Sequence, residues 1–87
     1  ELVLKIIHTP GHTQGSISIA ANDVVFTGDT LFANSIGRTD LNGGNYDLII
    51  KSIKEKLMPL HDDTIVFPGH GPASRIGVEK VTNPFIK

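Results

Sequence analysis

The segment Phe26-Thr27-Gly28-Asp29-Thr30-Leu31-Phe32 joins the end of an apolar run, which begins at Val24, to a single carboxylate. No residue beside Asp29 in the sequence can pair with it. A buried carboxylate without a partner is costly, so Asp29 must meet a cation, a cluster of hydrogen-bond donors or water in the folded chain. Any partner that is a side chain must therefore come from elsewhere in the sequence.

Two other segments are built in the same way. The apolar run Ile6-Ile7 is followed by Thr9-Pro10-Gly11-His12, and the run 65–67 is followed by Pro68-Gly69-His70. Glycine suits a tight turn because it adopts backbone conformations that other residues avoid. If the three turns lie at the same edge of one sheet, the two histidines and Asp29 come together there.

Histidine and aspartate side chains are suitable ligands for Zn(II), Fe(II) or Mn(II). A single histidine of this kind is more often structural than a ligand, but one pattern repeated three times favours a metal site of His12, Asp29 and His70. The other two histidines lack the pattern. We expect His8 to be structural, with a hydrogen bond to the following loop, and His61 to be solvated in a polar turn.

Composition narrows the class of protein. The 87 residues suffice for one small domain with a modest core. The net charge is −1 with both signs interspersed, which gives no electrostatic basis for binding nucleic acid or an anionic membrane. No run approaches the roughly 18 apolar residues that a membrane span needs. The chain has no cysteine, which excludes disulfides and thiolate metal ligands and fits a cytoplasmic protein.

Hydrophobic patterning predicts four strands, a long loop and one main helix. The strands are expected at residues 2–7, 16–20, 24–27 and 64–67. Residues 30–44 keep no period and are expected to form a loop, while a helical turn is expected at 78–81. The helix is expected at 45–57, begun by an Asn45 cap and stopped by Pro59. Its apolar face contains Tyr46, Ile49, Ile50, Ile53 and Leu57.

These elements predict an α+β fold with one mixed sheet and one helix across it. One helix cannot bury all the apolar strand residues, which include Leu2, Leu4, Ile6, Ile17, Ile19, Val25 and Phe67. Burying each such side chain is worth roughly 1.5–3 kcal/mol, against a total stability of about 5–15 kcal/mol for a domain. We therefore expect a partner, either a second copy or the rest of a longer polypeptide. The start at Glu1, inside a strand-like run, favours the longer polypeptide.

The motifs Thr9-Pro10-Gly11-His12-Thr13, Phe26 to Phe32 and Phe67-Pro68-Gly69-His70-Gly71 resemble three successive motifs of the metallo-β-lactamase superfamily in residues, order and spacing. The resemblance is greatest to the glyoxalase II-type hydrolases, and Gly37-Arg38-Thr39-Asp40 resembles a segment of small glyoxalase II-like proteins and persulfide dioxygenases. The resemblance to the superfamily covers nearly all of the chain. It implies a metallo-β-lactamase-type αββα sandwich, of which residues 1–87 match about the C-terminal half, with the N-terminal half absent.

The resemblance also implies roles for three residues. His12 is similar to the third histidine of the first metal site, Asp29 to the carboxylate that bridges both metals, and His70 to the terminal histidine of the second site. The implied cofactors are two Zn(II) ions, or Fe or Mn in their place. A metal-bound hydroxide would attack the carbonyl carbon of a small-molecule thioester, commonly a thioester of glutathione, with Asp29 as the catalytic ligand.

One departure from the family pattern is large. The His-x-His-x-Asp-His motif, which supplies four further ligands in the family, does not occur in the chain. We therefore expect these 87 residues alone to bind metal poorly and to be inactive. Two other readings stay open: a persulfide dioxygenase-like mononuclear iron oxidoreductase, which would not need His70 as a ligand, and a non-catalytic half-domain that associates with itself. In each reading, we expect the 30–44 loop to lie near the metal-binding edge, with Arg38 paired to Asp40.

Overall fold

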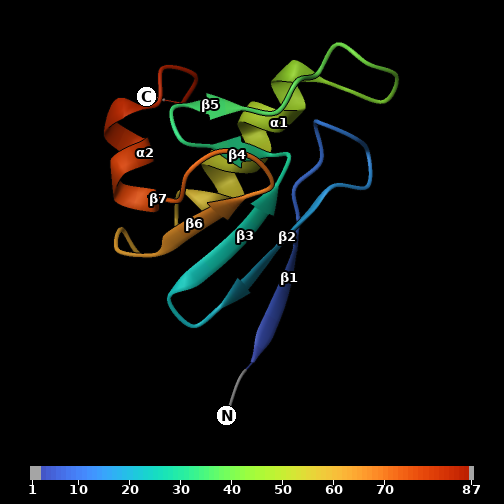
Figure 1. Ribbon diagram of the computed structural model, residues 1–87. Coiled ribbons are helices and arrows are strands. Elements are labelled where there is room, and N and C mark those ends of the chain that lie inside the picture. The colour runs from blue at the N-terminus through green and yellow to red at the C-terminus, as the bar shows by residue number, and fades with distance from the viewer. Residues whose placement is uncertain (1–2, 87) are drawn as a thin grey trace.

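The computed structural model describes residues 3–86, and a five-stranded mixed sheet is its main element (Figure 1). The strand order is β1-β2-β3-β6-β7. Strands β3 and β6 are parallel, and the other neighbours are antiparallel. The mixed sheet is as predicted, and the strands are β1 (Leu4–His8), β2 (Ile17–Ala21), β3 (Val24–Gly28), β6 (Ile65–Pro68) and β7 (Ser74–Arg75).

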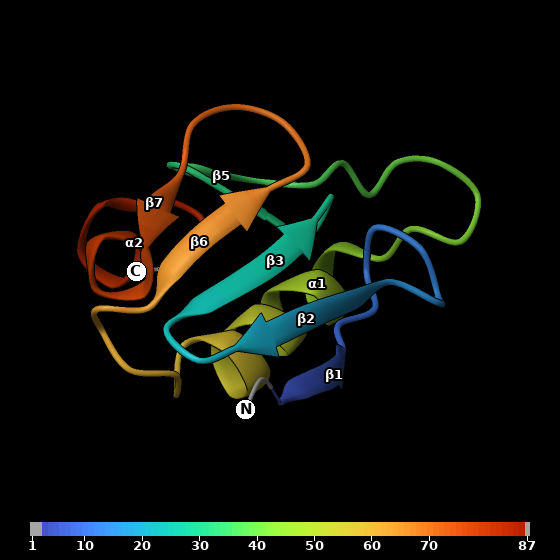
Figure 2. The ribbon, with the colours of Figure 1, turned by 60° about the horizontal axis from the view of Figure 1, so that its bottom comes forward.

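Three strands of the sheet run in the same direction. Because β1 is antiparallel to β2, and β2 is antiparallel to β3, β1 points the same way as β3 and β6. Their C-terminal ends therefore lie at one edge of the sheet, as Figure 2 shows for β3 and β6. The sequence predicts the two histidines and Asp29 at this edge.

The predicted helix at 45–57 has the expected extent but two parts. It begins as α1 (Tyr46–Ser52), where the Asn45 side chain accepts a hydrogen bond from the N–H of Leu48 (2.9 Å). It continues as the π-helix η1 (Ile53–Leu57), in which the N–H of Met58 donates to the carbonyl five residues earlier. The wider π-helical turn was not predicted, because the four-residue spacing of Ile49, Ile53 and Leu57 is compatible with either kind of helix.

A second helix, α2 (Ile76–Thr82), replaces the short helical turn expected at 78–81. The turn is therefore extended to a helix of seven residues, and the segment 46–57 remains the main helix, as expected. The two valines that suggested the turn, Val78 and Val81, are exposed, whereas Ile76 and Glu79 are buried. Among residues 3–86, no helix is long and apolar enough to cross a membrane.

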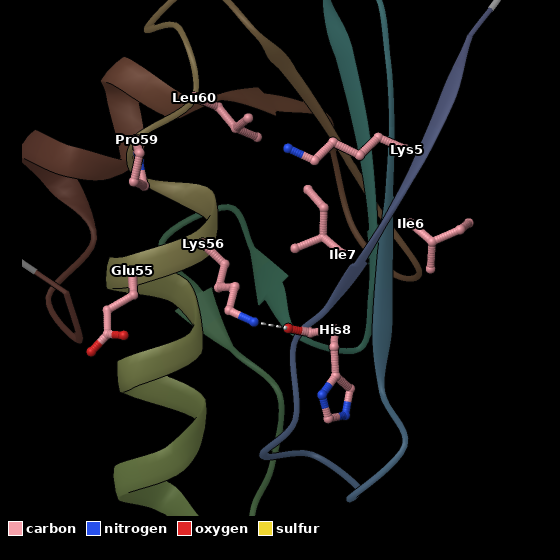
Figure 3. Close-up of a pocket in the computed structure, with 8 residues that line it drawn as sticks. All are labelled: Lys5, Ile6, Ile7, His8, Glu55, Lys56, Pro59 and Leu60. Carbon is pink, nitrogen blue, oxygen red and sulfur yellow. Dashed lines mark hydrogen bonds between the residues drawn. The ribbon is translucent and has the colours of Figure 1, made fainter.

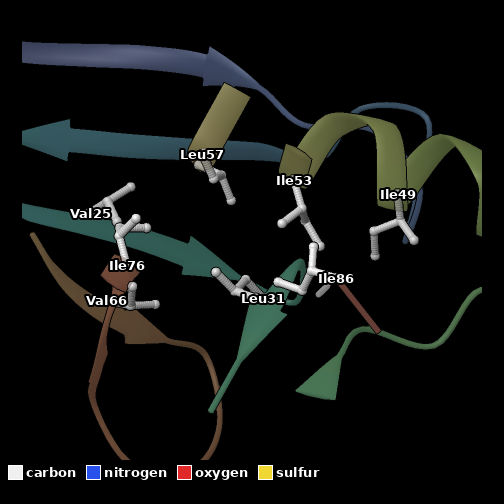
Figure 4. Close-up of a cluster of buried hydrophobic side chains, with 8 residues drawn as sticks. All are labelled: Val25, Leu31, Ile49, Ile53, Leu57, Val66, Ile76 and Ile86. Atoms are coloured by element: carbon white, nitrogen blue, oxygen red, sulfur yellow. The ribbon is translucent and has the colours of Figure 1, made fainter. Parts of the chain in front are cut away.

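Both helices pack on the same face of the sheet and form one core with it (Figures 1 and 4). The sheet contributes Val25 and Val66, and the helical segments contribute side chains from α1, η1 and α2. Tyr46 is half exposed and does not belong to this core, contrary to the predicted apolar stripe. The core residues are Val25, Leu31, Ile49, Ile53, Leu57, Val66, Ile76 and Ile86.

The opposite face of the sheet is apolar and exposed. One row crosses four strands in register, from Ile6 through Ile19 and Phe26 to Phe67, and the two phenylalanine rings stack with their centroids 5.6 Å apart. Ile6 is 59% exposed, Phe26 48% and Phe67 40%. The prediction that these side chains cannot all be buried is confirmed, except that Val25 is buried on the helix side; Leu2 lies outside the described residues.

The segment 30–44 is not the structureless loop that its sequence predicts. It contains a short hairpin of β4 (Leu31–Phe32) and β5 (Ser35–Ile36), with Asn34 in the left-handed region at φ +61°. Leu31 is fully buried in the core. Strands of two residues show no period in the sequence, so the pattern could not reveal them; β7 was missed for the same reason.

Candidate metal centre

The three predicted residues lie together at the C-terminal edge of the sheet. The carboxylate of Asp29 lies between the two imidazole rings. Its Oδ2 is 3.6 Å from Nε2 of His12, and its Oδ1 is 3.4 Å from Nε2 of His70. Each carboxylate oxygen thus faces a different histidine, although the three residues are far apart in the sequence.

These distances fit a carboxylate that joins two metal ions. Two ligands on one tetrahedral metal, with bonds of about 2.0–2.2 Å, lie about 3.4 Å apart. Asp29 and each histidine have this separation, so each pair can supply two ligands to one ion. Within residues 3–86, however, no three His, Cys, Asp or Glu side chains form a group that could hold a metal ion. A catalytic zinc usually has three protein ligands, so each ion would need more from outside this segment.

A backbone carbonyl fixes the orientation of the His12 ring. Nδ1–H of His12 donates to the carbonyl oxygen of Arg38 at 2.8 Å. Because a carbonyl can only accept, Nδ1 carries a proton, which leaves Nε2 as the ring nitrogen available to a metal. That nitrogen faces Asp29. Metal-binding histidines are commonly held in this way by a hydrogen bond to the other ring nitrogen.

Glycines allow the close packing around Asp29. Gly28 has φ +54°, a left-handed conformation that turns the chain directly before the carboxylate. A Cβ at Gly37 would overlap the backbone carbonyl of Asp29, and a Cβ at Gly69 would lie 3.2 Å from its Oδ1. A side chain at the glycine before His70 would therefore crowd Asp29, whereas the glycine before Asp29 suits the backbone conformation there.

An open cleft of about 370 Å³ lies over these residues. The β4–β5 hairpin forms one wall, where the Phe32 ring meets the His70 ring edge-on at a centroid distance of 6.1 Å. The His70 side chain is 80% exposed, so the hairpin is its main neighbour apart from Asp29. The cleft is lined by His12, Asp29, Phe32, Ser35, Ile36, Gly37, Arg38 and His70.

Arg38 and Asp40 form the predicted pair beside the cleft. Nε and Nη2 of Arg38 donate to Oδ1 and Oδ2 of Asp40 at 2.8 and 3.0 Å. These hydrogen bonds hold the pKa of the Asp40 carboxyl below its usual value and raise the pKa of Arg38. Both side chains are mostly exposed, so the pair contributes little to stability.

The other histidines lie away from the cleft, as expected. Nε2–H of His8 donates to the carbonyl oxygen of Gln14 at 2.9 Å, and His61 is exposed. A separate groove of about 490 Å³ runs between β1 and the end of the long helix (Figure 3). There Nζ of Lys56 donates to the carbonyl of His8 (3.4 Å), and none of the three predicted ligands lines the groove.

The mixed sheet, the helices on one of its faces and the His–Asp–His edge define an α+β protein with a candidate metal site at one end of its sheet. A sequence model of the metallo-beta-lactamase superfamily matches residues 1–70. The chain belongs to this superfamily, whose members are metal-dependent.

The proteins that this chain is similar to do not all share one named activity. The hydroxyacylglutathione hydrolase GloC of Haemophilus influenzae is 50% identical over 84 residues, which are 94% of this chain and 40% of that protein. The solved structure of BLEG-1 B3 metallo-beta-lactamase matches with a TM-score of 0.95 and 48% identity, over 99% of this chain and 42% of that one. TTHA1623 in a di-iron-bound form matches with a TM-score of 0.91 and 40% identity, over 95% and 42%. The chain thus spans about two-fifths of the length of these relatives.

Sequence reasoning missed two features of the site. One is the Arg38 carbonyl that holds His12, since a backbone group leaves no signal in the residue type. The other is Phe32, which was part of the quoted motif but had no role assigned to it. Its place three residues after Asp29 was the only available indication.

Proposed function

We propose that the complete protein containing these residues is a metal-dependent thioesterase that cleaves thioesters of the glutathione type. The observation that carries the proposal is the position of Asp29, with each carboxylate oxygen within 3.6 Å of a different histidine Nε2. This arrangement suits a carboxylate shared by two ions. His12, Asp29 and His70 are the proposed ligands, and Zn(II) is the proposed metal, with iron or manganese as alternatives.

The protein groups have separate tasks in this proposal. Two divalent ions, when bound, would supply an activated water and polarise the carbonyl of the substrate. His12 binds through Nε2 because its Nδ1–H donates to the backbone carbonyl of Arg38. Asp29 lies between the two histidines and faces each of them with one carboxylate oxygen. The apolar side chains of Phe32 and Ile36 form a wall against which an acyl group can lie. No protein nucleophile is needed, in keeping with the absence of cysteine.

The substrate class rests on similarity as well as on the cleft. The relative GloC, at 50% identity, has a name that specifies a hydroxyacylglutathione hydrolase. Arg38 projects beside the cleft with a permanent positive charge, which suits the carboxylates of a glutathione-type substrate. A β-lactam substrate is the competing choice, because BLEG-1 is similarly close in sequence.

The remaining part of the protein is proposed to cover the apolar face of the sheet and to complete the metal site. This assigns residues 1–87 to the C-terminal half of a metallo-β-lactamase-type domain. Two observations support the assignment: the exposed apolar row on the sheet, and a length of about two-fifths of the relatives. By itself, the segment offers two ligands to each ion, so we expect it to be inactive.

The test uses the complete protein and its Asp29→Asn variant, with Asp63→Asn as the control. The Asp63 side chain is 80% exposed in a turn away from the cleft. Metal content is measured after dialysis, and hydrolysis of a hydroxyacyl thioester of glutathione is followed spectroscopically. We expect about two ions per chain in the wild type and the control, and loss of both ions and of hydrolysis in Asp29→Asn.

Other outcomes would contradict the proposal. A single iron per chain, with oxygen-dependent oxidation of a persulfide and no thioester hydrolysis, would establish the oxidoreductase reading. Cleavage of a β-lactam without cleavage of the thioester would move the protein to another substrate class. A complete protein without metal and without activity on any of these substrates would leave the non-catalytic reading.

A further inference from the structure

A buried carboxylate on α2 has no role in the site described above. Glu79 is fully buried, and within residues 3–86 its carboxylate forms no salt bridge. Its oxygens instead accept three hydrogen bonds from neutral donors. Oε1 accepts from the N–H of Asn34 and from Nδ2 of Asn83, both at 2.9 Å, and Oε2 accepts from the hydroxyl of Ser74. A fully buried carboxyl group whose only partners are neutral donors indicates that acceptor oxygens are needed at this position.

The acceptor oxygens of Glu79 serve the turn of the β4–β5 hairpin. Nδ2 of Asn83, another fully buried side chain, also donates to the carbonyl of Ser35 at 3.0 Å and approaches that of Phe32 at 3.5 Å. Three backbone groups of the hairpin, two carbonyls and the Asn34 N–H, therefore have partners on Glu79 or Asn83. An apolar residue in place of Glu79 would remove the acceptor of the Asn34 N–H and one of the acceptors of the buried Asn83 amide.

The hairpin contacts one candidate ligand directly, and the segment that follows it contacts the other. From β4, the Phe32 ring lies against the ring of His70. Beyond β5, Gly37 donates its N–H to the carbonyl of Thr30 at 3.1 Å. The carbonyl of Arg38 then accepts the hydrogen bond from Nδ1–H of His12. A displacement of the hairpin would therefore change the surroundings of both imidazoles.

We propose that Glu79 and Asn83 are positioning residues for the metal centre: they fix the β4–β5 hairpin, and the hairpin orients His12 and His70. The proposal rests on the proposed function only in that the two histidines are taken as metal ligands. Neither residue touches a ligand side chain, so both act through the hairpin. Outer partners of metal ligands typically change metal affinity about 10–100-fold when removed.

The experiment compares Glu79→Ala with Glu79→Gln in the complete protein. The glutamine oxygen can accept from Asn34 and Asn83 while its amide group donates to the Ser74 hydroxyl, which can also accept. Glu79→Gln should therefore keep the hairpin in place. Ser74→Ala is the matched control, because it removes one bond to Glu79 and leaves both bonds to Asn34 and Asn83 intact.

Two readouts do not depend on catalysis. The first is zinc affinity, measured by competition with a chelator; we expect Glu79→Ala to weaken it at least about 10-fold, and Glu79→Gln and Ser74→Ala to stay near the wild type. The second is the histidine ¹⁵N spectrum of the metal-free protein. In Glu79→Ala, the Nδ1–H signal of His12 should be lost or should appear together with that of the other tautomer. In the two other variants it should be kept.

Several results would overturn the proposal. The first is a folded Glu79→Ala protein with the wild-type zinc affinity and His12 signal. If Glu79→Ala fails to fold, Asn83→Ala takes its place and must weaken zinc binding in the same way. If neither variant folds while Ser74→Ala does, the network serves general stability and the positioning role is refuted. A wild type that binds zinc without cleaving thioesters would refute the proposed function and leave this inference standing.

Discussion

Replacement of Ile6 by alanine in the complete protein tests whether the apolar face of the sheet is covered. Ile6 lies at the start of the row that crosses β1, β2, β3 and β6, and it is 59% exposed within the described residues. If the rest of the protein packs on this face, Ile6 is a core side chain. If the face stays in water, Ile6 is a half-exposed surface side chain, and its removal matters much less.

The two cases differ in free energy by a measurable amount. Full burial of an isoleucine is worth roughly 1.5–3 kcal/mol, and Ile6 is about two-fifths buried here, so the contacts now present contribute about 0.6–1.2 kcal/mol. A large-to-small substitution in a packed core costs about 2–5 kcal/mol, because a cavity is left behind. We expect the value for Ile6→Ala to fall in the second range.

The assay is denaturant unfolding of the metal-free protein, since bound metal would add its own stabilisation. Val81→Ala is the control: Val81 is 69% exposed on α2, and its loss should change the free energy of unfolding by less than about 0.5 kcal/mol. A cost for Ile6→Ala of about 1 kcal/mol or less would refute the reasoning. A large cost together with stability that rises with protein concentration would identify a second copy as the covering partner.

Three further predictions concern the site. Gly37→Ala should weaken zinc binding and hydrolysis, because its Cβ would displace the backbone of Asp29, whereas Gly15→Ala, with open space around it, should change neither. Arg38→Ala should raise KM with little change in kcat or in thermal midpoint, because the exposed pair with Asp40 adds little stability. Because the pKa of Asp40 is lowered, its pair with Arg38 stabilises the folded protein above the ordinary pKa of 3.8, and this stabilisation is lost as the pH falls through the lowered pKa. The unfolding curves of the wild type and Arg38→Ala should therefore converge in acid.

Each of these predictions has an outcome that contradicts it. Wild-type zinc affinity in Gly37→Ala would show that the backbone at this point can move without cost. A lower thermal midpoint with unchanged KM in Arg38→Ala would assign the arginine to bracing its loop. A stability difference that grows as the pH falls would mean that the charge of Asp40 has another partner.

The meeting of His12, Asp29 and His70 could be predicted because it depends on two strong regularities. Each residue follows a run that is apolar and β-forming, and each run ends in a turn with glycine. Because β1, β3 and β6 share a direction, the residues that follow them meet at one edge. The exposed face was predictable by the same means, from apolar residues too numerous for one helix.

The support of the site could not be predicted, because it is built from short strands and polar side chains. The β4–β5 hairpin has two residues in each strand, so no alternation can be seen. Helix α2 was placed by its valines, which are exposed, whereas its buried polar residue is Glu79. A glutamate in a short helix normally suggests a solvated face, and only the donors supplied by Asn34, Ser74 and Asn83 make its burial favourable.

The incomplete ligand set and the exposed apolar face together suggest that metal binding and folding are coupled. Asp29 and the two histidines lie at the edge of the same sheet whose outer face is apolar. In the proposed complete protein, the segment that covers this face would bring its own loops to that edge, where the missing ligands are needed. Metal would then bind tightly only after the two parts have packed, and its binding free energy would add to the stability of their contact. Ile6→Ala should therefore weaken zinc binding as well as stability, although Ile6 does not line the cleft.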